Sequence, residues 1–168
     1  MVVEHEDADM GYETLRDELR TIVAEHADDC RIYGSRADAD IRSAEDALGV
    51  TFPEEYRSFI RDFGAADFYG FEVYGVLGHE PSLESNVPSC VWVTQSERKH
   101  GLPAEFVVIS ASGDGVTYVL STVSPFEVYA YGGYDFATHP PKAVEPSFGE
   151  LLRKYIDQAQ RMIDEDDE

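Results

Sequence analysis

The spacing of apolar residues changes period along this chain, and the order of those changes constrains the fold more than any other feature. Helical spacing comes first, because Leu15, Leu19, Ile22 and Val23 recur at helical intervals within residues 12–26. Strand-forming residues follow later, and a last helical segment closes the pattern. Helices grouped around a block of strands predict an α+β fold. A doubly wound nucleotide-binding fold would need strands and helices in regular alternation.

Two further helices are predicted before the strands, after a loop over residues 30–35. The first covers residues 38–48, and we expect Ser35 or Asp38 to cap its start and Gly49 to end it with a positive φ. Pro53 is the expected first residue of the next helix. Its buried face and its end are predicted at Tyr56, Phe59, Ile60, Phe63 and Gly64.

The second half of the chain predicts short strands, with one helix among them and one after them. β-branched and aromatic residues predict strands within 68–77 and at 106–110, 116–120 and 128–131, with a hairpin turn at 112–115. Residues 86–99 are interpreted as a helix. The last helix is predicted over 147–163, with Ser147 as its cap and Glu150 in capping-box register.

A chain of 168 residues suits one domain, which we place at 12–163. The acidic segments 1–11 and 164–168 are expected to be mobile tails. No apolar run is long enough to cross a membrane, and the first residues lack the features of a secretory signal. The sequence therefore predicts a cytoplasmic protein.

Acidic residues dominate the charge, with 34 Asp and Glu against 13 Lys and Arg and a formal net charge of −21. Residues 35–160 hold 19 of the acids and 9 of the bases, so the acidity is not confined to the ends. Such a surface repels nucleic acid and anionic membranes, and it favours a basic protein partner. Adaptation to high salt is the alternative explanation, since the only lysines are Lys99, Lys142 and Lys154.

The sequence contains none of the short motifs that mark common active sites, such as GxxxxGK[ST], GxSxG or HExxH. The glycines at 113–115 lead into a strand, whereas a phosphate loop leads into a helix. The two cysteines and five histidines show no metal-binding spacing. A hydrolase built on Ser110, Ser112 and His139 lacks the expected local context. We therefore expect no enzymatic activity, no metal and no cofactor.

The most specific pattern lies at residues 41–60, which read IRSAEDALGVTFPEEYRSFI. This segment resembles the SMI1/KNR4 (SUKH) signature, I-x-x-A-E-x-x-L-G followed by a hydrophobic-Pro step and Y-x-x-F-[LI]. The family usually continues with Asn-Gly, whereas this chain has Phe63-Gly64. The likeness covers about residues 38–156. Its principal positions are Ile41, Glu45, Leu48, Gly49, Pro53, Tyr56, Phe59, Gly64 and Gly75.

The resemblance implies an α+β domain with a mixed, largely antiparallel sheet wrapped by N-terminal helices and a C-terminal helix. The motif residues are expected to be structural, and Glu45 is expected in a capping role or a buried ion pair. The resemblance also implies a protein-binding role. Bacterial members resemble immunity proteins against toxins, often nucleases, and fungal members resemble regulators of cell-wall synthesis. A general interaction or regulatory module without a toxin partner is the alternative.

An acidic inhibitor could occupy the basic cleft of a nuclease toxin, with aromatic side chains as anchors. Two stretches of this chain combine acidic and aromatic residues. The first comprises Asp67, Phe68, Tyr69, Glu72, Tyr74, Glu80 and Glu84. The second comprises Tyr131, Tyr134, Asp135 and Phe136. Each aromatic residue could instead be part of the core. We expect a monomer or weak dimer that binds a cognate toxin with a basic surface, and neither nucleic acid nor a membrane.

Overall fold

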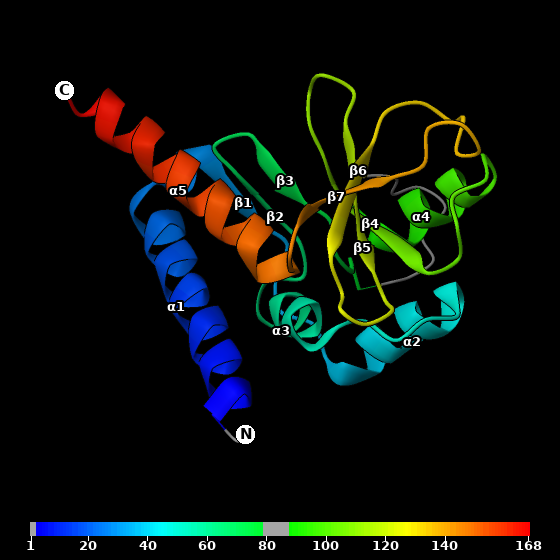
Figure 1. Cartoon of the computed structure of the whole chain (residues 1–168). Helices are drawn as coiled ribbons and strands as arrows, with labels where there is room; N and C mark the ends of the chain where they lie inside the picture. The colour runs from blue at the N-terminus through cyan, green and yellow to red at the C-terminus, as the bar shows by residue number, and fades with distance from the viewer. Residues whose placement is uncertain (1–2, 79–87) are drawn as a thin grey trace.

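A computed structural model describes residues 3–78 and 88–168, and Figure 1 shows the arrangement of its helices and strands. The long helices α1 and α5 lie side by side on one flank of the molecule, and α2 and α3 lie together at another side. The elements are α1 (Val3–Glu25), η1 (Ala27–Asp29), β1 (Cys30–Ile32), α2 (Asp38–Leu48), α3 (Glu54–Phe63), β2 (Ala66–Phe68), β3 (Phe71–Val73), α4 (Cys90–Arg98), β4 (Phe106–Ala111), β5 (Thr117–Ser121), β6 (Val128–Tyr131), β7 (Lys142–Glu145) and α5 (Phe148–Asp166).

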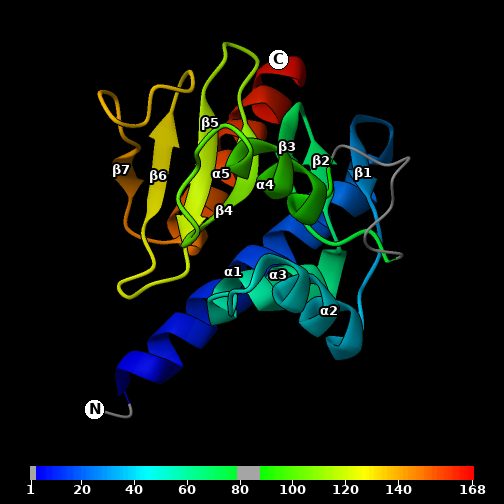
Figure 2. The same ribbon diagram turned by 90° about the vertical axis from the view of Figure 1, so that its right-hand side faces the viewer.

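The strands form two antiparallel sheets, ordered β1-β2-β3 and β4-β5-β6-β7. A hydrogen bond of 2.8 Å from the Tyr74 amide to the Ile109 carbonyl joins the two sheets where β3 ends. Parallel pairing occurs in the described residues as an isolated bridge between Gly75 and Ser89. Figure 2 shows the four-stranded sheet on the left and the three-stranded sheet on the right. The predicted α+β class is confirmed, with its largely antiparallel strands divided between two sheets.

The helical spacing at the N-terminus is confirmed, because Leu15, Leu19 and Ile22 are buried in the core. Two helices are longer than predicted, because α1 already begins at Val3 and α5 continues to Asp166. The predicted loop over 30–35 is also corrected, since Cys30–Ile32 forms the edge strand β1. A strand of three residues carries too little alternation to be recognised in the sequence.

The corner between α2 and α3 follows the signature closely. Ile41 and Leu48 are buried on one face of α2, and Gly49 ends the helix with a φ of 68°. Pro53 occupies the N-cap of α3, one residue before the predicted position. The expected cap of α2 is wrong, because Ala37 takes the N-cap and no side chain bonds there. At the start of α5 the predicted cap is confirmed, since Ser147 Oγ accepts from the Glu150 amide at 3.2 Å.

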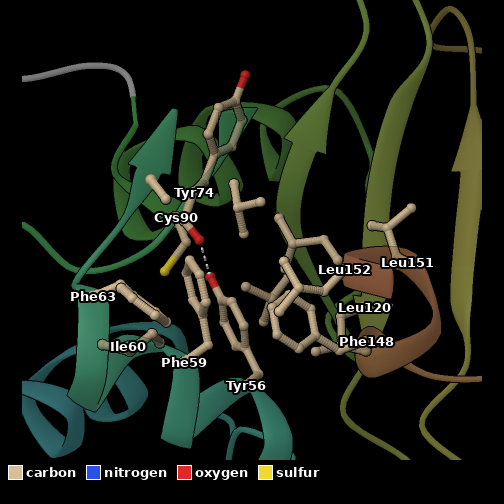
Figure 3. Close-up of a cluster of buried hydrophobic side chains, with 14 of the residues drawn as sticks. Tyr56, Phe59, Ile60, Phe63, Tyr74, Cys90, Leu120, Phe148, Leu151 and Leu152 are labelled. Carbon is tan, nitrogen blue, oxygen red and sulfur yellow. Dashed lines mark hydrogen bonds between the residues drawn. The ribbon is translucent and has the colours of Figure 1, made fainter. Parts of the chain in front are cut away.

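Aromatic residues of α3 form the centre of the core, as Figure 3 shows. Tyr56 and Phe59 are fully buried, and Phe148 from the start of α5 meets both rings edge-on at centroid distances of 5.1 and 5.4 Å. The Tyr56 hydroxyl donates to the carbonyl of Tyr74 at 2.7 Å, so the polar end of this buried ring is satisfied. These contacts fasten α5 and the end of β3 to the same helix.

Gly64 and Gly75 lie where two backbone segments cross at very short range. A Cβ added to Gly75 would overlap the carbonyl oxygen of Gly64 and lie 2.8 Å from its carbonyl carbon. A Cβ added to Gly64 would overlap the carbonyl oxygen of Gly34. The Val76 amide donates to Gly64 O at 3.0 Å and holds the crossing together. Both signature glycines are therefore required by close backbone approach.

Candidate partner-binding surface

The first candidate surface is the outer face of the three-stranded sheet. In the antiparallel register, Asp67 of β2 lies opposite Arg31 of β1 on one side and Glu72 of β3 on the other. Ala66 and Phe68, which flank Asp67, are buried, so strand alternation turns Asp67 away from the core. The three charged residues thus form a row across the outer face.

Asp67 and Glu72 place like charges directly opposite each other, which destabilises a sheet. Partial burial raises the pKa of Glu72 above its ordinary value, and the Asp67 charge raises it further. Arg31 lies next to Asp67, but its guanidinium carbon is 4.4 Å from the centroid of the Tyr33 ring. A hollow of about 50 Å³ beside the two acids is too small for a ligand of ordinary size. A pair of acidic residues that lowers the stability of its sheet is typical of a binding surface.

Tyr69 occupies the two-residue turn between β2 and β3. Its φ of 51° and the φ of 83° at Gly70 give the left-handed pair that a type I′ hairpin requires. The Tyr69 amide donates to the carbonyl of Asp29 at 2.9 Å, and its ring meets His26 edge-on with centroids 5.8 Å apart. Desolvation and then the charges of Asp29 and other acids, including Asp166, raise the pKa of Tyr69. The turn therefore places a half-exposed phenol beside η1, within electrostatic range of the acidic end of α5.

Three predicted contact residues are buried instead: Phe68 is 0%, Tyr74 5% and Tyr131 6% exposed. Phe68 alternates with Asp67 and so faces the core, while Tyr74 lies in the core where the two sheets join. Burial raises the pKa of Tyr74. The expectation that these three rings are surface anchors is wrong, because a partner cannot reach them. Glu80 and Glu84, also predicted as contact residues, lie outside the described residues.

The second candidate surface lies at the end of β6. Tyr134 is 55% exposed, its ring stacks on His100 with centroids 4.1 Å apart, and its hydroxyl donates to Glu97 at 3.3 Å. The buried Tyr131 donates to the same carboxylate, and its ring packs edge-on against Phe136. The Glu97 charge, followed by desolvation, raises the pKa of Tyr134. One carboxylate thus orients both tyrosines and holds Tyr134 toward solvent.

Asp135, the remaining predicted residue, is exposed and organises the loop after β6. Its carboxylate accepts from the Thr138 amide at 3.2 Å and lies 3.8 Å from the His139 ring. Figures 1 and 2 both place this loop on the opposite side of the four-stranded sheet from β1–β3. The two predicted stretches are therefore separate surfaces rather than one continuous patch.

Glu45 has the structural role expected of it. It is 6% exposed, and its carboxylate accepts from the Phe52 amide at 2.7 Å and from Arg57 Nη2 at 3.1 Å. The two bonds tie the end of α2 to the joint before α3 and to α3 itself. This charged position of the signature therefore stabilises the corner between α2 and α3.

The described residues do not bring Ser110 and His139 together as a hydrolase would need. Ser110 is buried, where its hydroxyl donates to the Glu72 carbonyl at 2.6 Å and lies 2.8 Å from the Tyr155 hydroxyl. His139 pairs with Asp135 on the exposed loop instead. Among residues 3–78 and 88–168, no group of three or more His, Cys, Asp or Glu side chains is arranged to hold a metal ion.

The sequence predicts no contact residue on α1 or α5, yet a groove of about 390 Å³ runs between these helices. Arg153 of α5 bridges it by pairing with Glu18 of α1 and, at 3.0 Å, with Asp157. Glu18 and Arg153 are 135 residues apart in the chain, so a single sequence offers no signal for this pairing. Each helix alone shows only an amphipathic pattern with a polar outer face.

Comparison with known proteins places the signature in a family. The family model described as SMI1-KNR4 cell-wall (SUKH_5) matches residues 16–157. No curated protein matches the chain. In the described part of the chain, every helix is too short or too polar to cross a membrane. The match spans most of the chain, and the family includes immunity proteins of polymorphic toxin systems. The chain therefore belongs to the SMI1/KNR4 (SUKH) family.

Proposed function

We propose that this chain is an immunity protein that neutralises a toxin by binding it directly, and that the toxin domain carries a basic, nuclease-type surface. The observation that carries the proposal is the family match over residues 16–157. The formal net charge of −21 supports a partner with a basic surface. A nuclease must present a basic surface to hold nucleic acid, and an acidic protein of complementary shape can cover that surface.

The exposed parts of the two candidate surfaces suit this role. Asp67 and Glu72 supply adjacent negative charge on the three-stranded sheet. Tyr69 and Tyr134 supply half-exposed and exposed rings, the residue type that most often anchors protein interfaces. The chain acts by occupying a surface, so catalysis is not required of it, and the cytosol that the toxin attacks is its expected place of action.

Co-expression with any toxin domain that a neighbouring gene encodes tests the proposal. Bacteria that produce the toxin alone should stop growing, and bacteria that also produce this chain should recover. Failure to bind or neutralise any such domain would reject the immunity role and favour a regulatory module without a toxin partner.

Charge reversal at the first surface provides the mechanistic part of the test, and it distinguishes a binding role of the acidity from salt adaptation. The double variant Asp67→Lys with Glu72→Lys should slow association at low salt by about tenfold, because electrostatic steering is lost. The matched control, Asp46→Lys with Glu105→Lys, makes the same change in net charge at two exposed positions outside both surfaces. Equal effects of the two double variants would show that only the overall charge matters.

A further inference from the structure

The groove between α1 and α5 has an apolar floor and charged walls. Ile22 and Ile156, both 3% exposed, form the floor between the helices. The walls carry four carboxylates and one guanidinium, a formal charge of −3 with His26 neutral. The charged residues are Asp17, Glu18, Glu25, Asp157 and Arg153. The shape and the charge both suit a long cationic side chain, whose aliphatic stem needs apolar contact and whose head needs carboxylates.

The nearby cations of α1 and α5 compensate this acidity only in part. Arg20 faces away from the groove, because its guanidinium lies 3.7 Å from Asp62 and 5.9 Å from the Phe63 ring centroid, both on α3. Arg16 pairs with Asp17 at the rim. Arg153 pairs with both Glu18 and Asp157. No ion pair among the described residues involves Glu25.

The helix ends increase the negative potential further. Neither α1 nor α5 has a basic residue in its last turn. Figure 1 shows the C-terminal ends of both helices at the same end of the molecule, so the negative ends of two helix dipoles lie together. A helix pair usually places Lys or Arg at such ends, and here a cation from another molecule would fill that role.

The groove continues the first candidate surface. His26 lines the groove and also meets the ring of Tyr69 edge-on. A partner segment lying against Tyr69 would therefore extend into the space between α1 and α5. This continuity distinguishes the groove from the other acidic parts of the molecule.

We propose that the groove between α1 and α5 receives arginine or lysine side chains from a basic segment of the partner protein, next to a contact at Tyr69. The inference rests on the proposed function for the identity of the partner, and on the groove itself for the chemistry of the segment. The cationic head would lie between Glu25 and Asp157, with its stem over Ile22 and Ile156.

A titration with a synthetic peptide tests the groove without any toxin. The probe contains only arginine and alanine, and its binding is measured by fluorescence anisotropy at about physiological ionic strength. The groove variant Glu25→Lys with Asp157→Lys should weaken binding by about tenfold, equivalent to about 1.4 kcal/mol. The charge-matched control, Asp46→Lys with Glu105→Lys, should weaken it by no more than about twofold.

Thr21→Trp separates shape from charge. Thr21 is an exposed residue of the groove lining, so the indole should fill the space with no change in net charge. Weaker peptide binding by this variant supports the groove, and circular dichroism checks that each variant is folded. Equal effects of the two double variants, or unchanged binding by Thr21→Trp, would overturn the proposal. Peptide binding tests the proposed role of the groove even if growth rescue fails, because rescue tests only the immunity role.

Discussion

Replacing Gly75 by alanine should destabilise the fold more than the same substitution at Gly49 or Gly113. The new Cβ would overlap the carbonyl oxygen of Gly64 and lie 3.3 Å from the Cα of Ala65, and both are backbone atoms that cannot rotate away. The two segments must separate. Three hydrogen bonds join them to each other and to the start of α4: Val76 N to Gly64 O at 3.0 Å, Gly75 N to Pro88 O at 2.9 Å and Cys90 N to Gly75 O at 2.8 Å.

Loss of these bonds at about 1 kcal/mol each gives a decrease of about 3 kcal/mol in the free energy of unfolding. Urea denaturation followed by circular dichroism measures it. Gly49 and Gly113 serve as controls, since neither has a neighbour within 4 Å of an added Cβ. Gly113→Ala should change stability by less than about 0.5 kcal/mol. Gly49→Ala, at a φ of 68°, should cost about 1 kcal/mol through backbone strain alone. A smaller loss for Gly75→Ala than for Gly49→Ala would refute the close-approach argument.

Three further predictions concern polar groups. Glu45→Ala should lower the free energy of unfolding by about 2–3 kcal/mol, because the Phe52 amide and Arg57 lose a buried charged acceptor; urea denaturation measures this. Tyr56→Phe should cost about 1 kcal/mol in the same assay, since the buried Tyr74 carbonyl loses its donor; no change would mean that another group replaces it. Partial burial raises the pKa of Glu72 in the folded state above its value in the unfolded chain. Protonation of Glu72 therefore favours folding, and this stabilisation is present below the unfolded pKa and is lost as pH rises through the higher folded pKa. Glu72→Gln should therefore stabilise the protein at pH 7 by less than about 1 kcal/mol and flatten the pH dependence of its melting temperature, and an unchanged pH profile would contradict this.

The sequence was most informative where local chemistry determines structure. The corner from Ile41 to Gly64 could be predicted because helical spacing, a positive-φ glycine and a proline all indicate the same two helices. The part of α1 before Gly11 could not be predicted, because the N-terminal segment is acidic and shows little apolar periodicity. The division into two sheets depends on long-range pairing, such as the bond between Tyr74 and Ile109, which periodicity does not report.

The candidate surfaces were predicted only in part, for a physical reason. Alternation along β2 puts Asp67 and Phe68 on opposite faces, but the sequence does not say which aromatic residues a sheet buries. Tyr74 and Val73 are both buried although they are adjacent, because the chain leaves the sheet at this point and alternation stops applying. The groove arises from the packing of α1 against α5, so its carboxylates are recognisable as a set only in three dimensions.

The salt dependence of association between this chain and the toxin domain that we propose as its partner tests the central claim most directly. Stopped-flow mixing gives the association rate constant at increasing ionic strength. Direct binding steered by an acidic surface predicts rapid association at low salt and a decrease of at least about tenfold by about 0.5 M salt. A rate constant that does not change with salt would contradict the electrostatic account, and the absence of any association would contradict direct neutralisation itself.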